Sequence, residues 1–212
     1  RTGELTMNSA LGTKAWQTFT QRYWNVEPIE LHYAPRGDDG PSLDVVSYLD
    51  RKGRLVLPPY QPHVPIHFKL SGDPTPYRVG RQWLEAAQLM VDDMTARGIH
   101  GEVTLSPEIV DPRPWLWSWY RVTPRFTYIV DFPFDLSGVD RSVRQHANKA
   151  IRRGYTCRQT ENLNDAIHCL NGSEHRKGFN YGITLDGLEM AIALLGRDAF
   201  RVYVCYSPDG EP

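Results

Sequence analysis

Residues 77–97, YRVGRQWLEAAQLMVDDMTAR, carry the periodicity that most constrains how this 212-residue chain can fold. Apolar side chains recur there at spacings of three and four residues, which predicts a helix with one apolar stripe. The stripe consists of Trp83, Ala86, Ala87, Met90, Val91 and Met94. Gly98 follows as a residue suited to closing a helix. A helix with apolar side chains on one face has to bury that face against another layer of secondary structure. The strand patterns nearby therefore indicate what this helix packs on.

Strand patterns precede this helix. Residues 28–34, PIELHYA, alternate between apolar and polar side chains, and two β-rich runs at 43–49 and 54–57 flank the turn DRKG, which predicts a hairpin. Residues 58–68, PPYQPHVPIHF, hold too many prolines for an interior strand and predict a surface loop. An earlier helix is expected within residues 9–24, where four apolar side chains recur at helical spacing.

Two further strands are expected after the helix. Residues 101–106, GEVTLS, read as a strand, and residues 127–132, TYIVDF, form a continuous apolar run typical of a strand buried on both faces. Between them lies WLWSWY, residues 115–120. Its tryptophans alternate, so in an extended segment they would share one face, most simply against the core.

The second half of the chain predicts alternating elements. A basic helix from residue 138 is followed by a strand at 155–160, helices at 162–178 and 185–196, and a strand at 200–207. We therefore expect an α/β (α+β) fold, with a mixed sheet flanked by helices. VVSYLDRKGRLV and VYVCYSPDGEP each enter a Gly-containing turn, which suggests an internal repeat whose second copy is incomplete. The last strand would then keep an unpaired edge.

Composition excludes several classes of protein. The formal net charge of −1 argues against a dedicated DNA-binding domain, and no apolar run reaches the roughly 18 residues that a membrane span needs. The N-terminal residues lack a signal-peptide pattern. Three cysteines without CxxC spacing predict neither a disulfide framework nor a zinc site, so a cytoplasmic location is expected. Cys157 and Cys205 lie in strand-like runs and are expected to be buried.

The most unusual local feature is GVDRSVRQHANKAIRRGYT, residues 138–156. A helix with Ser137 as N-cap would gather apolar side chains on a face that packs on a core, and basic and amide side chains on the other. The apolar set is Val139, Val143, Ala147, Ala150 and Ile151, and the polar set is Arg141, Arg144, Gln145, Asn148 and Arg152, with Lys149 on the flank. These charges are typical of a helix face exposed to solvent, which is one interpretation. Two features instead favour an anion-binding site: Arg is used rather than Lys, and no Glu lies at the i±4 positions where it would pair with these cations.

Residues 127–212 resemble the Fem-type branch of the GNAT acyltransferase superfamily, through TYIVDF, the basic helix ending in KAIRRG, the junction EHRKGF and the strand entering DG. The resemblance implies two tandem GNAT-like domains, residues 1–135 and an incomplete second copy at 136–212. It implies transfer of an acyl or aminoacyl group from acyl-CoA or aminoacyl-tRNA to an amine acceptor, such as a nucleotide-linked peptidoglycan precursor. No permanently bound cofactor, metal or membrane span is implied.

The same resemblance suggests where phosphates or substrate would bind. The candidates are Arg141, Arg144, Lys149 and Arg152 on the basic helix, with His175, Arg176, Lys177 and Tyr181 at the EHRKGFNY corner. The corner can equally be a charged helix end closed by Gly178. No catalytic residue is identified.

Two other functions stay open. The sequence lacks the Q/R-x-x-G-x-G/A loop that binds pyrophosphate in the superfamily. This absence favours a non-catalytic GNAT-shaped binding or scaffold module. An RNA-binding domain, with tRNA as the ligand, is the third interpretation, and it rests on the arginine-rich helix.

Overall fold

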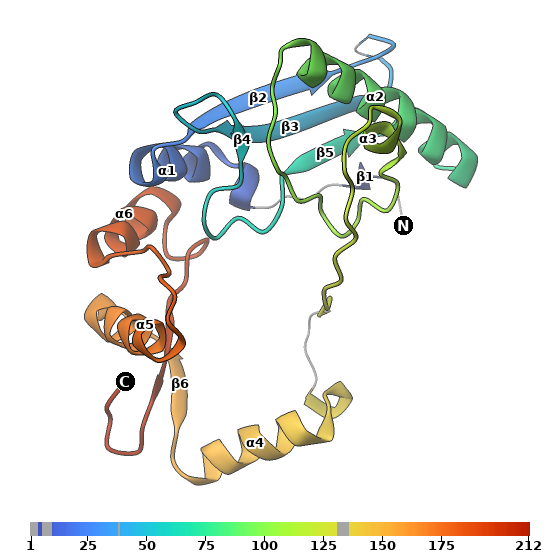
Figure 1. Cartoon of the computed structure of the whole chain (residues 1–212). Coiled ribbons are helices and arrows are strands. Elements are labelled where there is room, and N and C mark those ends of the chain that lie inside the picture. The colour runs from blue at the N-terminus through green and yellow to red at the C-terminus, as the bar shows by residue number, and fades with distance from the viewer. Residues whose placement is uncertain (1–3, 6–9, 38, 131–135) are drawn as a thin grey trace. The chain divides into compact units, whose positions relative to one another are not determined.

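The computed structural model describes residues 4–5, 10–37, 39–130 and 136–212. The chain divides into two compact units, residues 1–126 and 127–212, and the helices and strands of each are labelled in Figure 1. The sequence had placed this division at 135/136. The units combine helices with antiparallel strands, which confirms the mixed α/β class.

The first unit is built on one antiparallel sheet. Its strands are β1 (Glu4–Leu5), β2 (Glu27–Tyr33), β3 (Ser42–Leu49), β4 (Leu55–Val56) and β5 (Ile66–Lys69). They run in the order β1-β5-β3-β2, and β4 pairs with the end of β3. The register of β2 on β3 runs from Glu27 opposite Leu49 to Tyr33 opposite Leu43. The strand predicted at 28–34 is thereby confirmed.

The hairpin between β3 and β4 is closed by one carboxylate. Asp50 accepts hydrogen bonds from the Arg54 and Lys52 backbone N–H groups, and from the Arg54 guanidinium at 2.7 Å. These bonds, with those from Arg54 the largest cause, hold the pKa of Asp50 at about 2. Gly53 takes the left-handed conformation that the turn requires, with φ of 72°. The predicted DRKG hairpin is therefore confirmed.

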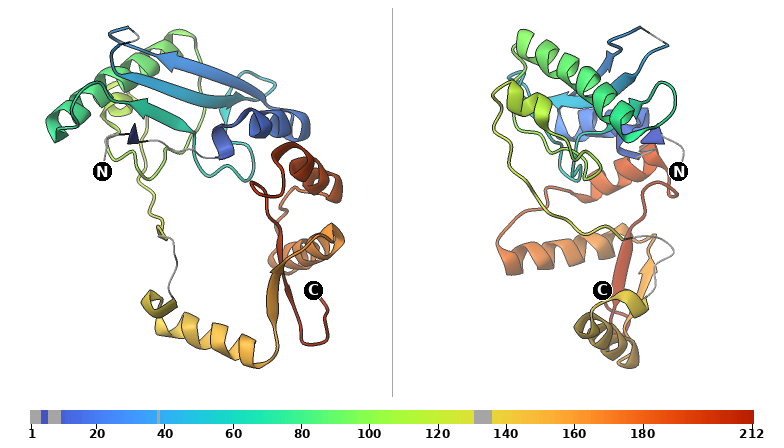
Figure 2. Two further views of the ribbon diagram at one scale, coloured as in Figure 1. Left: turned by 180° about the vertical axis from the view of Figure 1, so that it is seen from behind. Right: turned by 90° about the vertical axis from the view of Figure 1, so that its right-hand side faces the viewer.

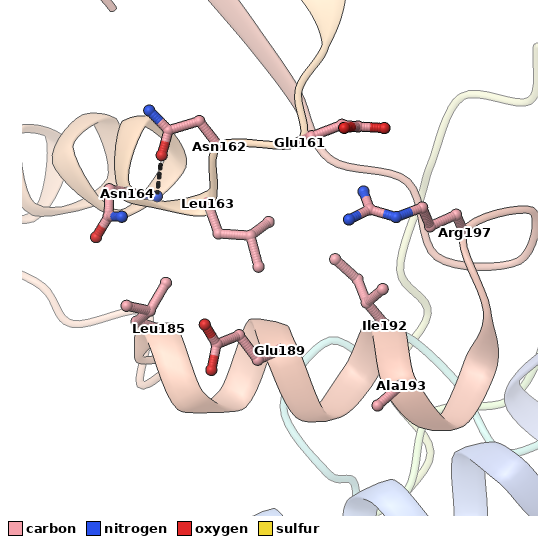
Figure 3. A pocket seen from close by; sticks show the side chains of 9 residues that line it. All are labelled: Glu161, Asn162, Leu163, Asn164, Leu185, Glu189, Ile192, Ala193 and Arg197. Atoms are coloured by element: carbon pink, nitrogen blue, oxygen red, sulfur yellow. Dashed lines mark hydrogen bonds between the residues drawn. The ribbon is translucent and has the colours of Figure 1, made fainter.

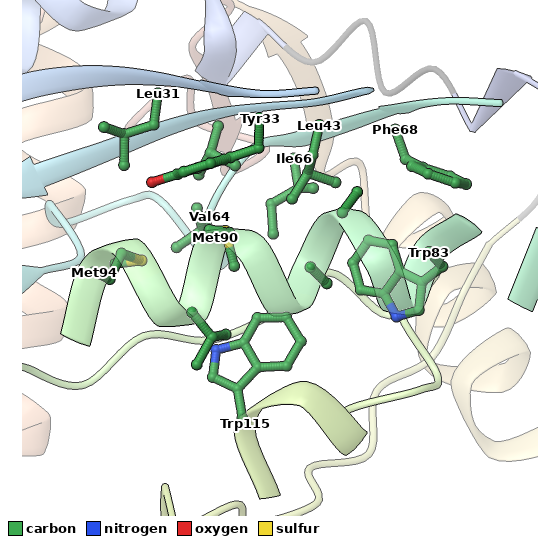
Figure 4. Packing of buried hydrophobic residues seen from close by; sticks show 14 of the residues in the cluster. Leu31, Tyr33, Leu43, Val64, Ile66, Phe68, Trp83, Met90, Met94 and Trp115 are labelled. Atoms are coloured by element: carbon green, nitrogen blue, oxygen red, sulfur yellow. The ribbon is translucent and has the colours of Figure 1, made fainter. Parts of the chain in front are cut away.

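Two helices cover opposite faces of this sheet. α2 (Pro76–Ala96) begins at Thr75, whose hydroxyl accepts from the Arg78 N–H, and it buries its whole predicted stripe. The sheet face that meets it is lined by Leu31, Tyr33, Leu43, Val45, Ile66 and Phe68 (Figure 4). The alternate side chains of each strand point to the opposite face of the sheet. On that face the Glu30 carboxylate accepts a hydrogen bond from the Gln17 side chain of α1 (Lys14–Trp24).

Three sequence expectations fail in this unit. Residues 66–69 form β5 because the prolines of the expected loop all precede Ile66. Residues 101–106 form no strand beyond one bridge between Gly101 and Leu55. WLWSWY is not extended, since α3 (Arg113–Trp117) occupies its first half. The helical turn separates the tryptophans, so Trp115 is buried whereas Trp119 is 96% exposed.

The second unit is a small two-layer structure. β6 (Thr156–Gln159) pairs antiparallel with β7 (Tyr203–Tyr206), α5 (Leu163–Lys177) lies beside this ribbon, and α6 (Leu185–Leu195) packs on α5 (Figure 2). Its core consists of Leu163, Ala166, Leu188, Val204 and Tyr206. Within the described residues β7 has no partner besides β6, so its second edge is unpaired as the sequence predicts.

The segment TYIVDF does not form the predicted buried strand in its described part. Residues 127–130 belong to no sheet, and Tyr128 is 98% exposed. An apolar run becomes a buried strand only when neighbouring strands pair with it, and none of the described strands does so. Residues 131 and 132 lie outside the described residues. No described helix combines the length and apolar character needed to cross a membrane.

A pair of leucine substitutions tests the core of the first unit. Leu43 is fully buried, so we expect Leu43→Ala to lower the free energy of unfolding by about 2–5 kcal/mol. Leu89, on α2 but 40% exposed, is the matched control, and Leu89→Ala should change it by less than about 0.5 kcal/mol. All six tryptophans lie within residues 1–126, so tryptophan fluorescence in urea reports on this unit. Equal effects of the two variants would contradict the packing.

Candidate functional site

The basic helix α4 (Arg141–Arg152) begins at Asp140, which corrects the prediction of Ser137 as its N-cap. The Asp140 carboxylate accepts from the Ser142 N–H at 2.8 Å, whereas Ser137 lies in the preceding 3-10 turn, η2 (Leu136–Gly138). A carboxylate is favoured at this point because it satisfies a free N–H and complements the positive end of the helix dipole.

Both faces of α4 are accessible. No residue of α4 is buried, and on the apolar face Val143 is 51% and Ile151 65% exposed. The expectation that this face packs on a core is therefore wrong for the described chain. The physical reason is that the second unit offers a ribbon of only two described strands, which α5 and α6 already use for their own core.

Among the residues that the structure describes, the cations of α4 lack acidic partners. Arg141, Lys149 and Arg152 are exposed and Arg144 is half-buried. Within the described residues no ion pair joins any of these four side chains to a carboxylate; Arg152 donates only to the Asn148 carbonyl, at 3.3 Å.

Several arginines of the first unit behave differently. Six of them pair with a carboxylate: Arg36, Arg54, Arg81, Arg97, Arg113 and Arg125. Their guanidinium groups are thus committed within the fold. Those of α4, apart from the Arg152 Nε that donates to Asn148, have donors available for an external anion.

The EHRKGFNY corner closes α5. Gly178 adopts φ of 71° and its N–H donates to the Glu174 carbonyl at 2.8 Å, so the structural interpretation of the corner as a glycine-closed helix end is confirmed. The Glu174 carboxylate accepts a hydrogen bond from the Tyr181 N–H. The Phe179 and Tyr181 rings pack edge to face, with 4.7 Å between their centroids. Lys177 lies over the Phe179 ring, with 6.0 Å between Nζ and the ring centroid.

The predicted site residues form two groups. His175, Arg176 and Lys177 are exposed at the end of α5, and in the described structure no hydrogen bond or ion pair links them to α4. Substrate contact at either group therefore remains a prediction. The corner owes its shape to Gly178 and Glu174.

A pocket of about 370 Å³, which no sequence pattern predicts, lies between the start of α5 and α6 (Figure 3). Its lining consists of Glu161, Asn162, Leu163, Asn164, Leu185, Glu189, Ile192, Ala193 and Arg197. Two carboxylates and one guanidinium thus stand around an apolar floor. They come from the β6–α5 junction, from α6 and from the turn after it, so no motif or spacing unites them.

A hydrogen-bond network fixes the α5 side of this pocket. The Tyr206 hydroxyl donates to Asp165 Oδ2 at 2.8 Å and lies 3.0 Å from the Thr160 hydroxyl. Asn162 caps α5 by accepting from the Asn164 N–H, and its amide donates to Asp165 Oδ1. The buried tyrosine of β7 therefore holds the first turn of α5 against the ribbon.

Known proteins give no further guidance, because no protein-family model, no curated protein and no solved structure matches the chain. Among the described residues no group of three or more His, Cys, Asp or Glu side chains is arranged to hold a metal ion.

Removing the buried hydroxyl of β7 tests the Tyr206 network. We expect Tyr206→Phe to destabilise the second unit by about 1–2 kcal/mol, because Asp165 and Thr160 each lose a partner. Hydrogen exchange of peptides from β6 and α5 in the full chain measures this change. Tyr203→Phe removes an exposed hydroxyl from the same strand and should change exchange protection by less than about 0.5 kcal/mol. Equal effects would contradict the network.

The cap of α4 should depend on pH. Hydrogen bonds from the Ser142 side chain and then from its backbone lower the pKa of Asp140. The cap is therefore complete above the ordinary aspartate pKa of about 3.9 and is lost as pH falls through the lowered value. The NMR shift of the Ser142 amide should follow this titration, with its midpoint below about 3.9. Asp140→Asn should keep the cap and abolish the titration. A midpoint above the ordinary value would contradict the assignment.

Proposed function

We propose that this chain is an N-acyltransferase or aminoacyltransferase of the Fem type, and that α4 binds the phosphate groups of its co-substrate. The observation that carries the proposal is the set of α4 guanidinium groups for which the described part of the chain provides no carboxylate partner, on a helix whose faces are both accessible. Acyl-CoA and aminoacyl-tRNA both present several phosphates. A guanidinium group can donate two parallel hydrogen bonds to two oxygens of one phosphate, whereas a lysine ammonium group acts as a point charge. Arginine therefore suits phosphate-bearing ligands better than lysine does.

The reaction moves an acyl or aminoacyl group to an amine. The amine has to lose its proton before it attacks the thioester or ester carbonyl, and the oxyanion that forms needs an N–H or cationic donor. The pocket between α5 and α6 supports the proposal as a place for the acceptor. Glu161 and Glu189 attract an ammonium group, Arg197 attracts a carboxylate or phosphate, and Leu163 supplies an apolar contact.

One observation favours a second candidate, a GNAT-shaped binding module without catalysis. The sequence contains no Q/R-x-x-G-x-G/A loop for the donor pyrophosphate. Such a module would bind the phosphate-bearing ligand through α4 and release no acylated amine. Binding and turnover measured on the same preparation therefore separate the two functions.

Titration of the full chain tests the role of α4. We expect acetyl-CoA, as the co-substrate assigned to α4, to bind, and the double variant Arg144→Ala with Arg152→Ala to weaken its binding about tenfold or more, because two charged donors are lost. Raising the salt concentration should weaken the wild-type protein more than the variant. For an aminoacyl-tRNA ligand the slope of log affinity against log salt should fall by about one for each arginine removed.

Arg97→Ala is the matched control, since Arg97 donates to Asp93 at 3.0 Å on the exposed side of a helix in the other unit. Its removal should leave ligand affinity unchanged. Formation of acylated amine by the wild-type protein supports the transferase, whereas binding without product supports the module. Equal affinities of the double variant and the wild-type protein would return α4 to a solvated helix.

A further inference from the structure

Two of the three cysteines meet across the ribbon of the second unit. Cys157 of β6 lies directly opposite Cys205 of β7 in the antiparallel register. Both side chains are exposed, and both are free thiols. This corrects the expectation that they are buried. The cause is the alternation along β7, in which Val204 and Tyr206 take the buried face and Cys205 the other.

The hydrogen-bond phase of the ribbon fixes the geometry of this pair. The Thr160 N–H donates to the Val202 carbonyl at 2.9 Å, so Thr160 and Val202 form a hydrogen-bonded pair that extends the same register. Such pairs alternate with non-hydrogen-bonded pairs along an antiparallel ladder. Counting back from Thr160, the pair Cys157–Cys205 is non-hydrogen-bonded.

This phase brings the two cysteines within disulfide range. Residues of a non-hydrogen-bonded pair have Cα atoms about 4.5 Å apart and side chains closer than in the alternate pairs. A disulfide requires Cα atoms about 4.4–6.8 Å apart. The sulfurs can therefore bond without separating β6 from β7.

The third cysteine is a poorer reaction partner. Partial burial, then the charge of Asp165 and the neighbouring Cys205, raise the pKa of the Cys169 thiol on α5. A raised pKa leaves less thiolate, the reactive form of the side chain. Cys169 also lies on a helix, outside the strand register that aligns Cys157 with Cys205.

We propose that Cys157 and Cys205 form a reversible disulfide site that reacts with small-molecule disulfides such as oxidised glutathione. One thiolate attacks a sulfur of the small disulfide and releases one small thiol, which leaves a mixed disulfide on the protein. The second cysteine attacks that bond and releases the other small thiol. Two protein thiols are oxidised, one small disulfide is reduced, and the protons of the protein thiols end on the released thiols.

The bond would control the stability of the second unit, whether or not the chain transfers acyl groups. It closes the segment 157–205, which contains α5, α6 and the pocket between them. Because a crosslink removes conformations from the opened state, the oxidised unit should open less often than the reduced one.

Oxidation of the full chain with oxidised glutathione tests the site. Mass spectrometry should show the loss of two hydrogen atoms, and peptide mapping should find Cys157 joined to Cys205. Hydrogen exchange in β6 and α5 should slow at least about tenfold on oxidation and recover with a reducing thiol. Cys169→Ser should behave as the wild-type protein does, whereas Cys157→Ser and Cys205→Ser should each remove both the crosslink and the protection.

Four outcomes would overturn the proposal. Three concern the product of oxidation: a stable mixed disulfide with glutathione at Cys157 or Cys205, a crosslink that joins Cys169 to either of them, and a Cys157–Cys205 bond that leaves exchange of the second unit unchanged. Circular dichroism of the serine variants before oxidation establishes that they are folded. A missing crosslink in a folded wild-type chain would also refute the site.

Discussion

The burial of one helix face against one sheet face determines the structure of the first unit. The stripe of α2 packs on the inward side chains of β2, β3 and β5, among them Leu43 and Phe68. Because side chains alternate along each strand, this contact fixes the register of the sheet and sends Glu30 and its neighbours to the opposite face, where Gln17 of α1 binds. Trp115 then packs against Trp83 and anchors the segment that follows.

The described residues of the second unit form only a two-stranded ribbon, and this difference shapes its candidate function. Its ribbon of two described strands supports α5 and α6 through Tyr206 and Val204 but gives α4 no apolar surface to cover. The basic helix therefore exposes arginines that have no carboxylate partner among the described residues, while six arginines of the first unit pair with a carboxylate. An exposed amphipathic helix with guanidinium groups on one face has hydrogen-bond donors that suit an anion, and this is the basis of the ligand proposed for α4.

Local signals predicted the elements whose partners are close in the chain. The 3.6-residue period of apolar side chains predicted α2, the turn DRKG predicted the β3–β4 hairpin, and Gly178 predicted the end of α5. Expectations failed where the outcome depends on distant partners. TYIVDF is apolar enough for a strand, but no described strand pairs with residues 127–130. Two local expectations failed as well: α3 forms within WLWSWY and separates its alternating tryptophans, and Asp140 rather than Ser137 caps α4.

The sequence by itself determined the mixed α/β class, the amphipathic helices and the concentration of arginine on α4, because composition and periodicity act over a few residues. Only the tertiary structure decided which side chains meet. It opposed Cys157 to Cys205, gathered Glu161, Glu189 and Arg197 around one pocket, and left α4 uncovered. The physical reason is that strand register and helix packing join residues far apart in the chain, and no local pattern encodes which distant partner a surface will find.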